Sequence, residues 1–377
     1  MKFTINSAEL LSALTMLNRA QASKNALPIL DCIRMELTAN GLHLTAADSD
    51  QTLETDLPVI DPSDINQCVC IPAAQFLSAL KELPSQPITF MGDDTTWGCR
   101  LDYANGHFNF IAHDPMAFPL PPKTLDKAQT ITIPANILAQ GIAYTKNSVG
   151  HDDLRPQMNG MAVDVQTDGN IVFVASDGHS LTRYIYKNAN TIENPFLFII
   201  PEKAAQLLSS LLARQTDDIS ININDTSFII TVGNYTLYAR LIEGRYPNYN
   251  SVIPTNNPFF AMVERDALVA AIRRVLVFAS AATALIQFSF DKDKLKISAQ
   301  DFDFNTSAEE TLACEYDHQP ISIGFSGTLL IDLLKQMPNT TLKVSMTDPS
   351  RPGIITPAEQ NEEEDILLLL MPMMLKA

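Results

Sequence analysis

The sequence has little positive charge: 26 lysines and arginines stand against 43 aspartates and glutamates, giving a net charge of −17. Proteins that bind nucleic acid with their outer surface are usually basic, so the negative net charge argues against a DNA-binding exterior. Long apolar runs are also missing, because no stretch reaches the roughly 18 residues that a membrane-spanning helix needs. The start, MKFTINSAEL, turns polar after five residues and does not look like a secretory signal. We therefore expect a cytoplasmic protein that does not enter a membrane.

Cysteine is scarce and irregularly spaced, with five residues in 377. An odd, scattered set is typical of a reducing compartment and not of a disulfide framework. Cys68 and Cys70 flank a single residue in a strand-like stretch. Two interpretations remain open for this pair: small buried apolar side chains, which we favour, or a metal or redox site.

The sequence motifs of common enzymes are absent. There is no G-x-x-x-x-G-K-[ST] phosphate loop, no G-x-S-x-G elbow and no histidine spacing that suits a metal. Asp177, His179 and Ser180 occur together in SDGHS, but neighbours on one tight turn cannot form a catalytic relay. We expect no catalytic residue, no metal and no cofactor. His179 then has two interpretations, a purely structural turn residue or part of a binding surface.

The strongest positive signal is internal repetition at a spacing of about 130 residues. One set of predicted helices follows an apolar strand end, with Pro72 and Pro201 placed in the first helical turn and Ser326 as a helix cap. The members of this set are CIPAAQFLSALKEL (70–83), IIPEKAAQLLSSLLAR (199–214) and IGFSGTLLIDLLKQM (323–337). A second set of helices precedes them at 6–20, 134–147 and 264–278.

Alternating apolar and polar residues repeat between the two sets of helices. Each of the segments 41–57, 170–186 and 294–312 alternates, reaches a turn with an aspartate, and alternates again, which predicts a pair of hairpin strands. Three features with one common spacing indicate three similar α+β domains, each with two helices on an antiparallel sheet. Polar, proline-containing stretches place the domains at 1–124, 125–253 and 254–377.

Several short motifs, in this order, resemble the bacterial sliding clamps, the β subunits of DNA polymerase III. They are ALPIL (26–30), NGM (159–161), SDGHSL (176–181), EGRYPNY (243–249), IGF (323–325) and MPM (371–373). The resemblance implies a head-to-tail homodimer whose six domains close a ring, with helices lining the pore. It also implies a processivity factor for DNA replication, which encircles duplex DNA without reading its sequence. Its partners would be the catalytic subunit of DNA polymerase III, the clamp loader and other polymerases or repair proteins, all held through short linear motifs.

The distribution of charge agrees with that resemblance. The six predicted helices carry nine basic and six acidic residues, a net charge of +3, so the rest of the chain carries −20. An acidic exterior would repel other DNA, while a mildly positive pore tolerates a threaded duplex. A second interpretation, in which these charges merely solvate helix surfaces, remains open.

The resemblance also assigns residues to DNA contact and to the dimer joint. DNA contact falls first on Lys24, Lys203 and Arg155. The chain departs from the family pattern at Ala74, where a basic residue is expected, and at Pro156 and Gln157, where tyrosines are expected, so Lys146 and Arg19 are further candidates. At the dimer joint, Phe108 and Phe110 on a strand at 106–112 are expected to meet Val277 and Phe278.

A partner-binding pocket is implied where the C-terminal tail meets the second domain. Its residues are Met158, Gly178, His179, Leu181, Pro247, Val252, Met371, Pro372, Met373 and Leu375. The leucines of 365–370 read as a last core strand, which Pro372 ends, leaving flexible methionines at the surface. Departures from the family at Thr283, Leu329 and Met374 predict a different pocket depth and charge preference. The alternatives are a loose chain end and a repeat scaffold that binds peptides without DNA.

Overall fold

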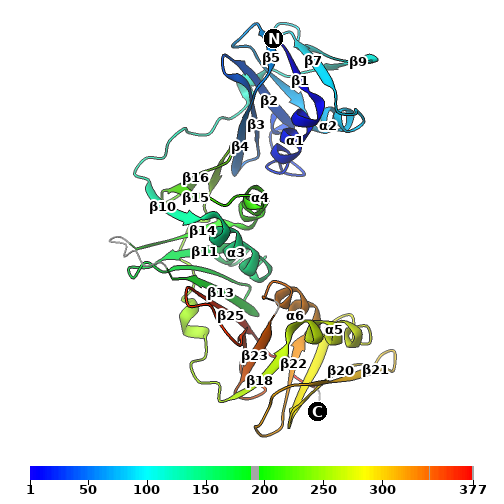
Figure 1. The fold of residues 1–377 in the computed structure, drawn as a ribbon, viewed down its shortest axis with the longest axis vertical. Coiled ribbons are helices and arrows are strands. Elements are labelled where there is room, and N and C mark those ends of the chain that lie inside the picture. The colour runs from blue at the N-terminus through cyan, green and yellow to red at the C-terminus, as the bar shows by residue number, and fades with distance from the viewer. Residues whose placement is uncertain (188–194, 339, 376–377) are drawn as a thin grey trace. The chain divides into compact units, whose positions relative to one another are not determined.

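The computed structural model describes residues 1–187, 195–338 and 340–375. They fall into two compact units, Met1–Asn136 with Leu207–Leu241, and Ile137–Gln206 with Ile242–Ala377. Along the chain the same order of elements occurs three times: strand, helix, strands, helix, strands (Figure 1). The predicted class, three similar α+β repeats with antiparallel sheets, is confirmed.

The three repeats have closely matching elements. The first repeat holds β1 (Lys2–Asn6), α1 (Ser7–Leu17), β2 (Cys32–Thr38), β3 (Gly41–Ala47), β4 (Gln51–Leu57), β5 (Ile60–Ser63), β6 (Cys68–Pro72), α2 (Ala73–Lys81), β7 (Pro87–Gly92), β8 (Gly98–Tyr103) and β9 (Gly106–Ile111). The second holds β10 (Gln129–Pro134), α3 (Ala135–Thr145), β11 (Gly160–Val165), β12 (Ile171–Ser176), β13 (Ser180–Tyr186), β14 (Phe196–Pro201), α4 (Glu202–Leu212), β15 (Asp218–Ile223), β16 (Ser227–Val232) and β17 (Tyr235–Arg240). The third holds β18 (Phe259–Glu264), α5 (Arg265–Leu276), β19 (Leu285–Asp291), β20 (Lys294–Asp301), β21 (Thr306–Ala313), β22 (Ile321–Ser326), α6 (Gly327–Leu334), β23 (Thr341–Met346), β24 (Gly353–Pro357) and β25 (Glu364–Leu370).

All six predicted helices and all three predicted hairpins are present, but two details of the helix starts were wrong. Pro72 and Pro201 are the last residues of β6 and β14 and stand just before the helices. The Ser326 hydroxyl lies 3.2 Å from that of Thr328 and does not cap a backbone N–H of α6. A true cap occurs at α1, where the Asn6 side chain accepts a hydrogen bond of 2.8 Å from the Ala8 N–H.

The strands form four antiparallel sheets, and the two largest sheets join consecutive repeats. In the first unit, β4 of repeat one pairs with β17 of repeat two inside an eight-stranded sheet. In the second unit, β13 of repeat two pairs with β25 of repeat three in the same way. The other two sheets are β5-β1-β7-β8-β9 and β21-β20-β19-β22, so β9 and β21 are edge strands.

Each sheet has one face against helices and one outer face. In repeat three, Phe288, Phe290 and Phe325 are buried on the helix-facing side, where the Arg274 guanidinium of α5 also holds Glu310 of β21. The outer faces of the two larger sheets are covered by the chain that connects one repeat to the next. Phe118 covers Leu30, Cys32, Ala47 and Cys70 in the first unit, and Tyr246 and Tyr249 cover the sheet of the second unit. In the described part of the chain, no helix is both long and apolar enough to span a bilayer.

Candidate partner-binding site

The turn between β12 and β13 is built by its own aspartate. The Asp177 carboxylate accepts hydrogen bonds from the backbone N–H groups of His179 at 2.8 Å and Ser180 at 2.6 Å. Gly178 has φ of +89°, a conformation that L side chains rarely adopt, and a Cβ there would lie 3.1 Å from an Arg155 guanidinium nitrogen. His179 is exposed at the tip, while Leu181 behind it is buried. The motif SDGHS therefore forms a turn that is fixed by its own aspartate and presents His179 to solvent.

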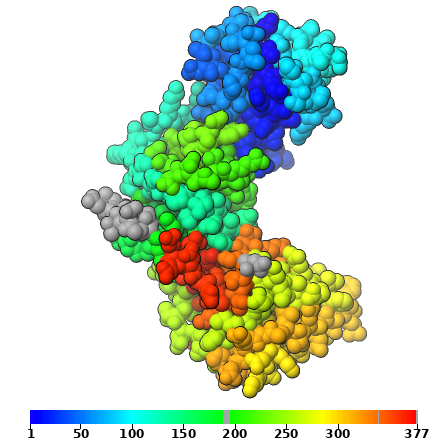
Figure 2. Space-filling model, in the orientation of Figure 1, coloured from blue at the N-terminus to red at the C-terminus, as the bar shows by residue number. Residues whose placement is uncertain are grey.

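The C-terminal tail is attached to this turn by its backbone. Leu367 to Leu370 of β25 are buried, as predicted for a last core strand. The Met371 N–H then donates to the His179 carbonyl at 2.8 Å, and the Met373 N–H donates to the Gly324 carbonyl at 2.8 Å. The segment Met371–Leu375 thus runs from the turn to the edge strand β22, and the interpretation of a loose end is wrong for these residues. The red surface in Figure 2 lies where Figure 1 draws β25, the strand before this tail, beside the orange elements of repeat three.

The connector between repeats two and three supplies the third side of the site. The Tyr249 hydroxyl donates to Asp164 at 2.7 Å, and Tyr246 is buried against the same cluster as Leu181 and Leu369. Burial raises the pKa of Tyr246, and the Asp177 carboxylate adds to that rise, so the hydroxyl stays protonated at neutral pH. These two anchors hold Pro247 and Val252 at the surface, where Val252 is 54% exposed.

Of the ten predicted pocket residues, Leu181 belongs to the buried cluster, and Met371 is bonded to His179 beside it. Met158 is buried, and its carbonyl accepts from the Gly150 N–H at 2.8 Å. Pro372, Met373 and Leu375 are half-buried, and Met371 is 40% exposed. Apolar side chains held half-exposed on a fixed backbone are suited to an apolar peptide anchor.

The residues predicted for DNA contact lie at helix ends and in loops. Lys24 and Lys146 are exposed, whereas the Arg19 guanidinium donates to the Ser210 hydroxyl at 2.6 Å. Lys203 lies in the first turn of α4. Arg155 is bound to the Asp152 carboxylate at 2.9 Å and stands beside Gly178 of the SDGHS turn.

Of the residues predicted for the dimer joint, two lie on the edge strand β9 and two directly follow α5. Phe108 and Phe110 share one face of β9, but Phe110 packs on Phe76 and Phe90 of its own repeat at ring distances of 5.3 and 6.0 Å. Val277, just after α5, is 78% exposed and Phe278 is 42% exposed.

No sequence pattern predicts the part that Tyr246, Tyr249 and Gly324 take in the candidate site. The two tyrosines stand in the motif EGRYPNY, and their spacing of three gave no sign that both are buried. Gly324 admits the tail because a Cβ there would lie 2.7 Å from the Met373 carbonyl oxygen.

Known proteins match this chain along nearly its whole length. Models of the DNA polymerase III beta subunit match at residues 1–115 for its N-terminal domain, 132–248 for its central domain and 250–374 for its C-terminal domain. The chain is 24% identical to a beta sliding clamp of Staphylococcus aureus over 98% of both chains. Its fold is similar to the sliding clamps of Bacillus subtilis (TM-score 0.91, 23% identity) and Bartonella birtlesii (TM-score 0.92, 22% identity), with full coverage of all chains. The chain therefore belongs to the family of DNA polymerase III beta subunits, the beta sliding clamps.

Proposed function

We propose that this protein is a processivity clamp: two copies close a ring around duplex DNA, and the ring tethers the replicative polymerase and other DNA-processing proteins. The observation that carries the proposal is the pair of free sheet edges at β9 and β21. The chain itself catalyses nothing in this scheme, and it acts where the chromosome is, in the cytoplasm.

The two joints inside the chain predict the joint between copies. Phe108, Leu237 and Leu368 occupy equivalent positions on the last strand of their repeats. They lie opposite Leu101, Ile230 and Ile355 of the strand before it. Leu53, Thr182 and Ala308 are equivalent on the strand after the hairpin turn. Each lies opposite an alanine that stands two residues before the aspartate of that turn. The observed joints pair Leu237 with Leu53 and Leu368 with Thr182.

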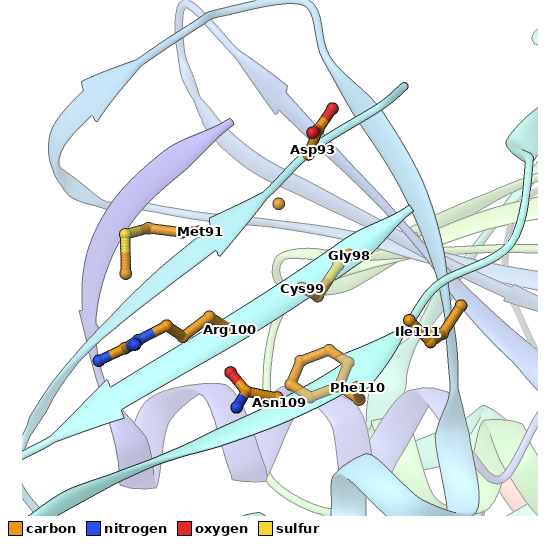
Figure 3. A pocket seen from close by; sticks show the side chains of 9 residues that line it. Met91, Asp93, Gly98, Cys99, Arg100, Asn109, Phe110 and Ile111 are labelled. Atoms are coloured by element: carbon orange, nitrogen blue, oxygen red, sulfur yellow. The ribbon is translucent and has the colours of Figure 1, made fainter. Parts of the chain in front are cut away.

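The same register applied once more pairs Phe108 with the partner's Ala308. A head-to-tail contact of this kind is heterologous, and it gives a closed ring if the second copy repeats it. It also covers two strand edges that would otherwise invite aggregation. On the outer face, the row of Met91, Arg100 and Asn109 in Figure 3 would continue onto the partner's Ser307.

Contacts between helices also repeat at the two joints inside the chain. Arg19, after α1, contacts Ser210 of α4, and Asn147, after α3, donates to the Asp332 carbonyl of α6 at 2.7 Å. Each contact joins the end of the first helix of one repeat to the second helix of the next. Val277 and Phe278, after α5, would then meet the partner's α2. Beside α2 lies a groove of about 240 Å³ that Phe76, Ala79 and Phe108 help to line.

The first prediction tests this register by disulfide cross-linking. Asn109 and the partner's Ser307 would form a hydrogen-bonded pair, because the equivalent joints have Arg240 N–H bonded to Asp50 and Lys187 N–H bonded to Glu363, each at 2.8 Å. Such pairs have Cα atoms about 5.5 Å apart, within the range for a disulfide. We expect Asn109→Cys with Ser307→Cys to give a covalent dimer under oxidising conditions, seen by non-reducing electrophoresis.

The matched control combines Asn109→Cys with Thr306→Cys. Successive side chains of a strand point to opposite faces, so this pair would lie on different faces and should cross-link at least tenfold more slowly. Equal cross-linking of both pairs would show that the register is wrong. The native cysteines are buried or half-buried and should add little background.

The second prediction concerns DNA. Contacts to the backbone alone carry no sequence information, and salt weakens them steeply. Once loaded, a closed ring is held by topology, so we expect retention on nicked circular DNA at salt that abolishes binding to linear DNA. Gel filtration of labelled protein with each DNA measures this. Equal loss from both DNAs would favour a peptide-binding scaffold that does not encircle DNA.

A further inference from the structure

The outer face of the sheet β21-β20-β19-β22 contains a cavity of about 640 Å³. Its walls include Leu285 at the start of β19 with Thr283 just before it, Gln300 on β20, and Met373 and Leu375 of the tail. The turn of the candidate partner site reaches the same tail at Met371, whose N–H bonds to the His179 carbonyl. The cavity is lined by residues of repeat three, shares Met373 and Leu375 with the predicted partner pocket, and reaches Ser307 beside the proposed joint.

The first repeat shows what fits this position. There, Phe118 packs on Leu30, Cys32, Ala47 and Cys70. Cys32 and Leu285 are equivalent, because each lies opposite the residue before the second helix of its repeat, and Leu30 and Thr283 each stand two residues earlier. The residues that line the cavity thus correspond to those on which Phe118 packs in repeat one.

Two further positions complete this correspondence. Ala47 and Gln300 each precede an aspartate, Asp48 or Asp301, whose carboxylate accepts backbone N–H groups of the following turn. Gly324 stands where Cys70 stands in repeat one, and both are bridged by the chain that leaves the last strand of the repeat.

In the second repeat aromatic side chains also fill this place. Tyr246 and Tyr249 cover its outer face, four and seven residues after Ile242 bonds to Ile199. In the third repeat the described tail covers only the edge strand, where a Cβ on Gly324 would lie 2.8 Å from a Leu375 methyl carbon. The position that aromatic rings fill in two repeats is thus a cavity in the third.

Charge indicates the rest of the occupant. Asp301, Asp303 and Glu309 line the cavity, and no lysine or arginine is among the residues described as lining it. The Lys296 ammonium, 3.4 Å from Glu309, neutralises part of this field. Acidic walls around an apolar bed favour a ligand with positive charge beside its apolar group.

We propose that this cavity binds an aromatic side chain from a linear, basic segment of a partner protein, in the place that Phe118 takes in repeat one. The proposal rests on the proposed function to the extent that clamp partners are held through linear segments. It adds a second contact for such partners on each copy of the chain. A short segment with one buried ring should bind weakly, with a dissociation constant on the order of 10 mM.

The chain supplies its own probe, the acetylated peptide PMAFPLPPK of residues 115–123, which contains Phe118 and ends in a lysine. Titration of protein with ¹³C-labelled methionine methyl groups should shift the Met373 and Met374 signals. The same peptide with alanine in place of Phe118 should shift them at least tenfold less. Equal shifts from both peptides, or none from either, would overturn the proposal.

Two tryptophan variants locate the binding. Ser298→Trp fills the cavity from its floor, whereas Lys296→Trp stands two residues away on the same face and outside the cavity. We expect the peptide to bind the Lys296→Trp variant and not the Ser298→Trp variant, and equal binding to both would refute the site. Retention of the Ser298→Trp variant on circular DNA is measured in parallel. If the native protein is not retained on circular DNA, the proposed clamp function is wrong. If only the peptide titration fails, the clamp function stands and the proposed cavity site is wrong.

Discussion

Replacing Phe108 and Val277 together with aspartate is expected to convert the dimer into monomers. In the proposed joint both side chains become buried against the partner, and each is worth roughly 1.5–3 kcal/mol of apolar burial. An unpaired carboxylate in the same place adds a desolvation cost. Together they should weaken each joint by about 100- to 10,000-fold. Light scattering at micromolar concentration should then report 41.5 kDa in place of twice that mass.

Two controls separate this effect from damage to the fold. Phe108 packs on Tyr103 with ring centres 4.9 Å apart, so its replacement costs some stability, whereas Val277 is 78% exposed and its single replacement should leave the melting temperature unchanged. Ile60→Asp changes an exposed side chain on β5, at the opposite edge of the same sheet, and should stay dimeric. A native chain that is monomeric at micromolar concentration would end the ring proposal.

The repeated elements could be predicted from sequence because their signals are local. Helix stripes such as Leu10, Leu14 and Leu17, all buried, repeat with the period of a helix. The joints between repeats could not be predicted in this way. Leu53 and Leu237 are 184 positions apart, and nothing local to either one selects the other. An exposed edge strand and a joined one share the same alternation, so only the structure shows which edges are free.

The candidate site, too, could be predicted only where its signals are local in the sequence. The tail was identified because apolar residues at a chain end, followed by Pro372, form a local anomaly. Arg155 was assigned to DNA from loop position alone, while the structure places it beside Gly178. The cavity near Thr283 has no sequence signal, since it depends on an aromatic residue that two repeats supply and the third does not.

Deleting residues 371–377 is expected to abolish tight binding of partner peptides while leaving the ring intact. The deletion removes Met371, Met373 and Leu375 but keeps β25, whose seven pairs with β13 hold repeats two and three together. It also removes only two described backbone hydrogen bonds, to His179 and Gly324. Losing two or three apolar anchors should cost roughly 2–4 kcal/mol, or about 30- to 1000-fold in affinity. Fluorescence anisotropy with a labelled polymerase-derived peptide measures the change.

Met374→Ala is the matched control within the tail. Position 374 stands at the rim of the pocket with its side chain 92% exposed, so the loss of its apolar atoms should change peptide affinity by no more than about twofold. The truncated chain should also remain on circular DNA, because the proposed ring joint lies at β9 and β21. A polymerase peptide that binds the full and truncated chains equally well would show that partners are held elsewhere. Loss of the dimer on truncation would instead show that the tail stabilises the fold and is not only a binding surface.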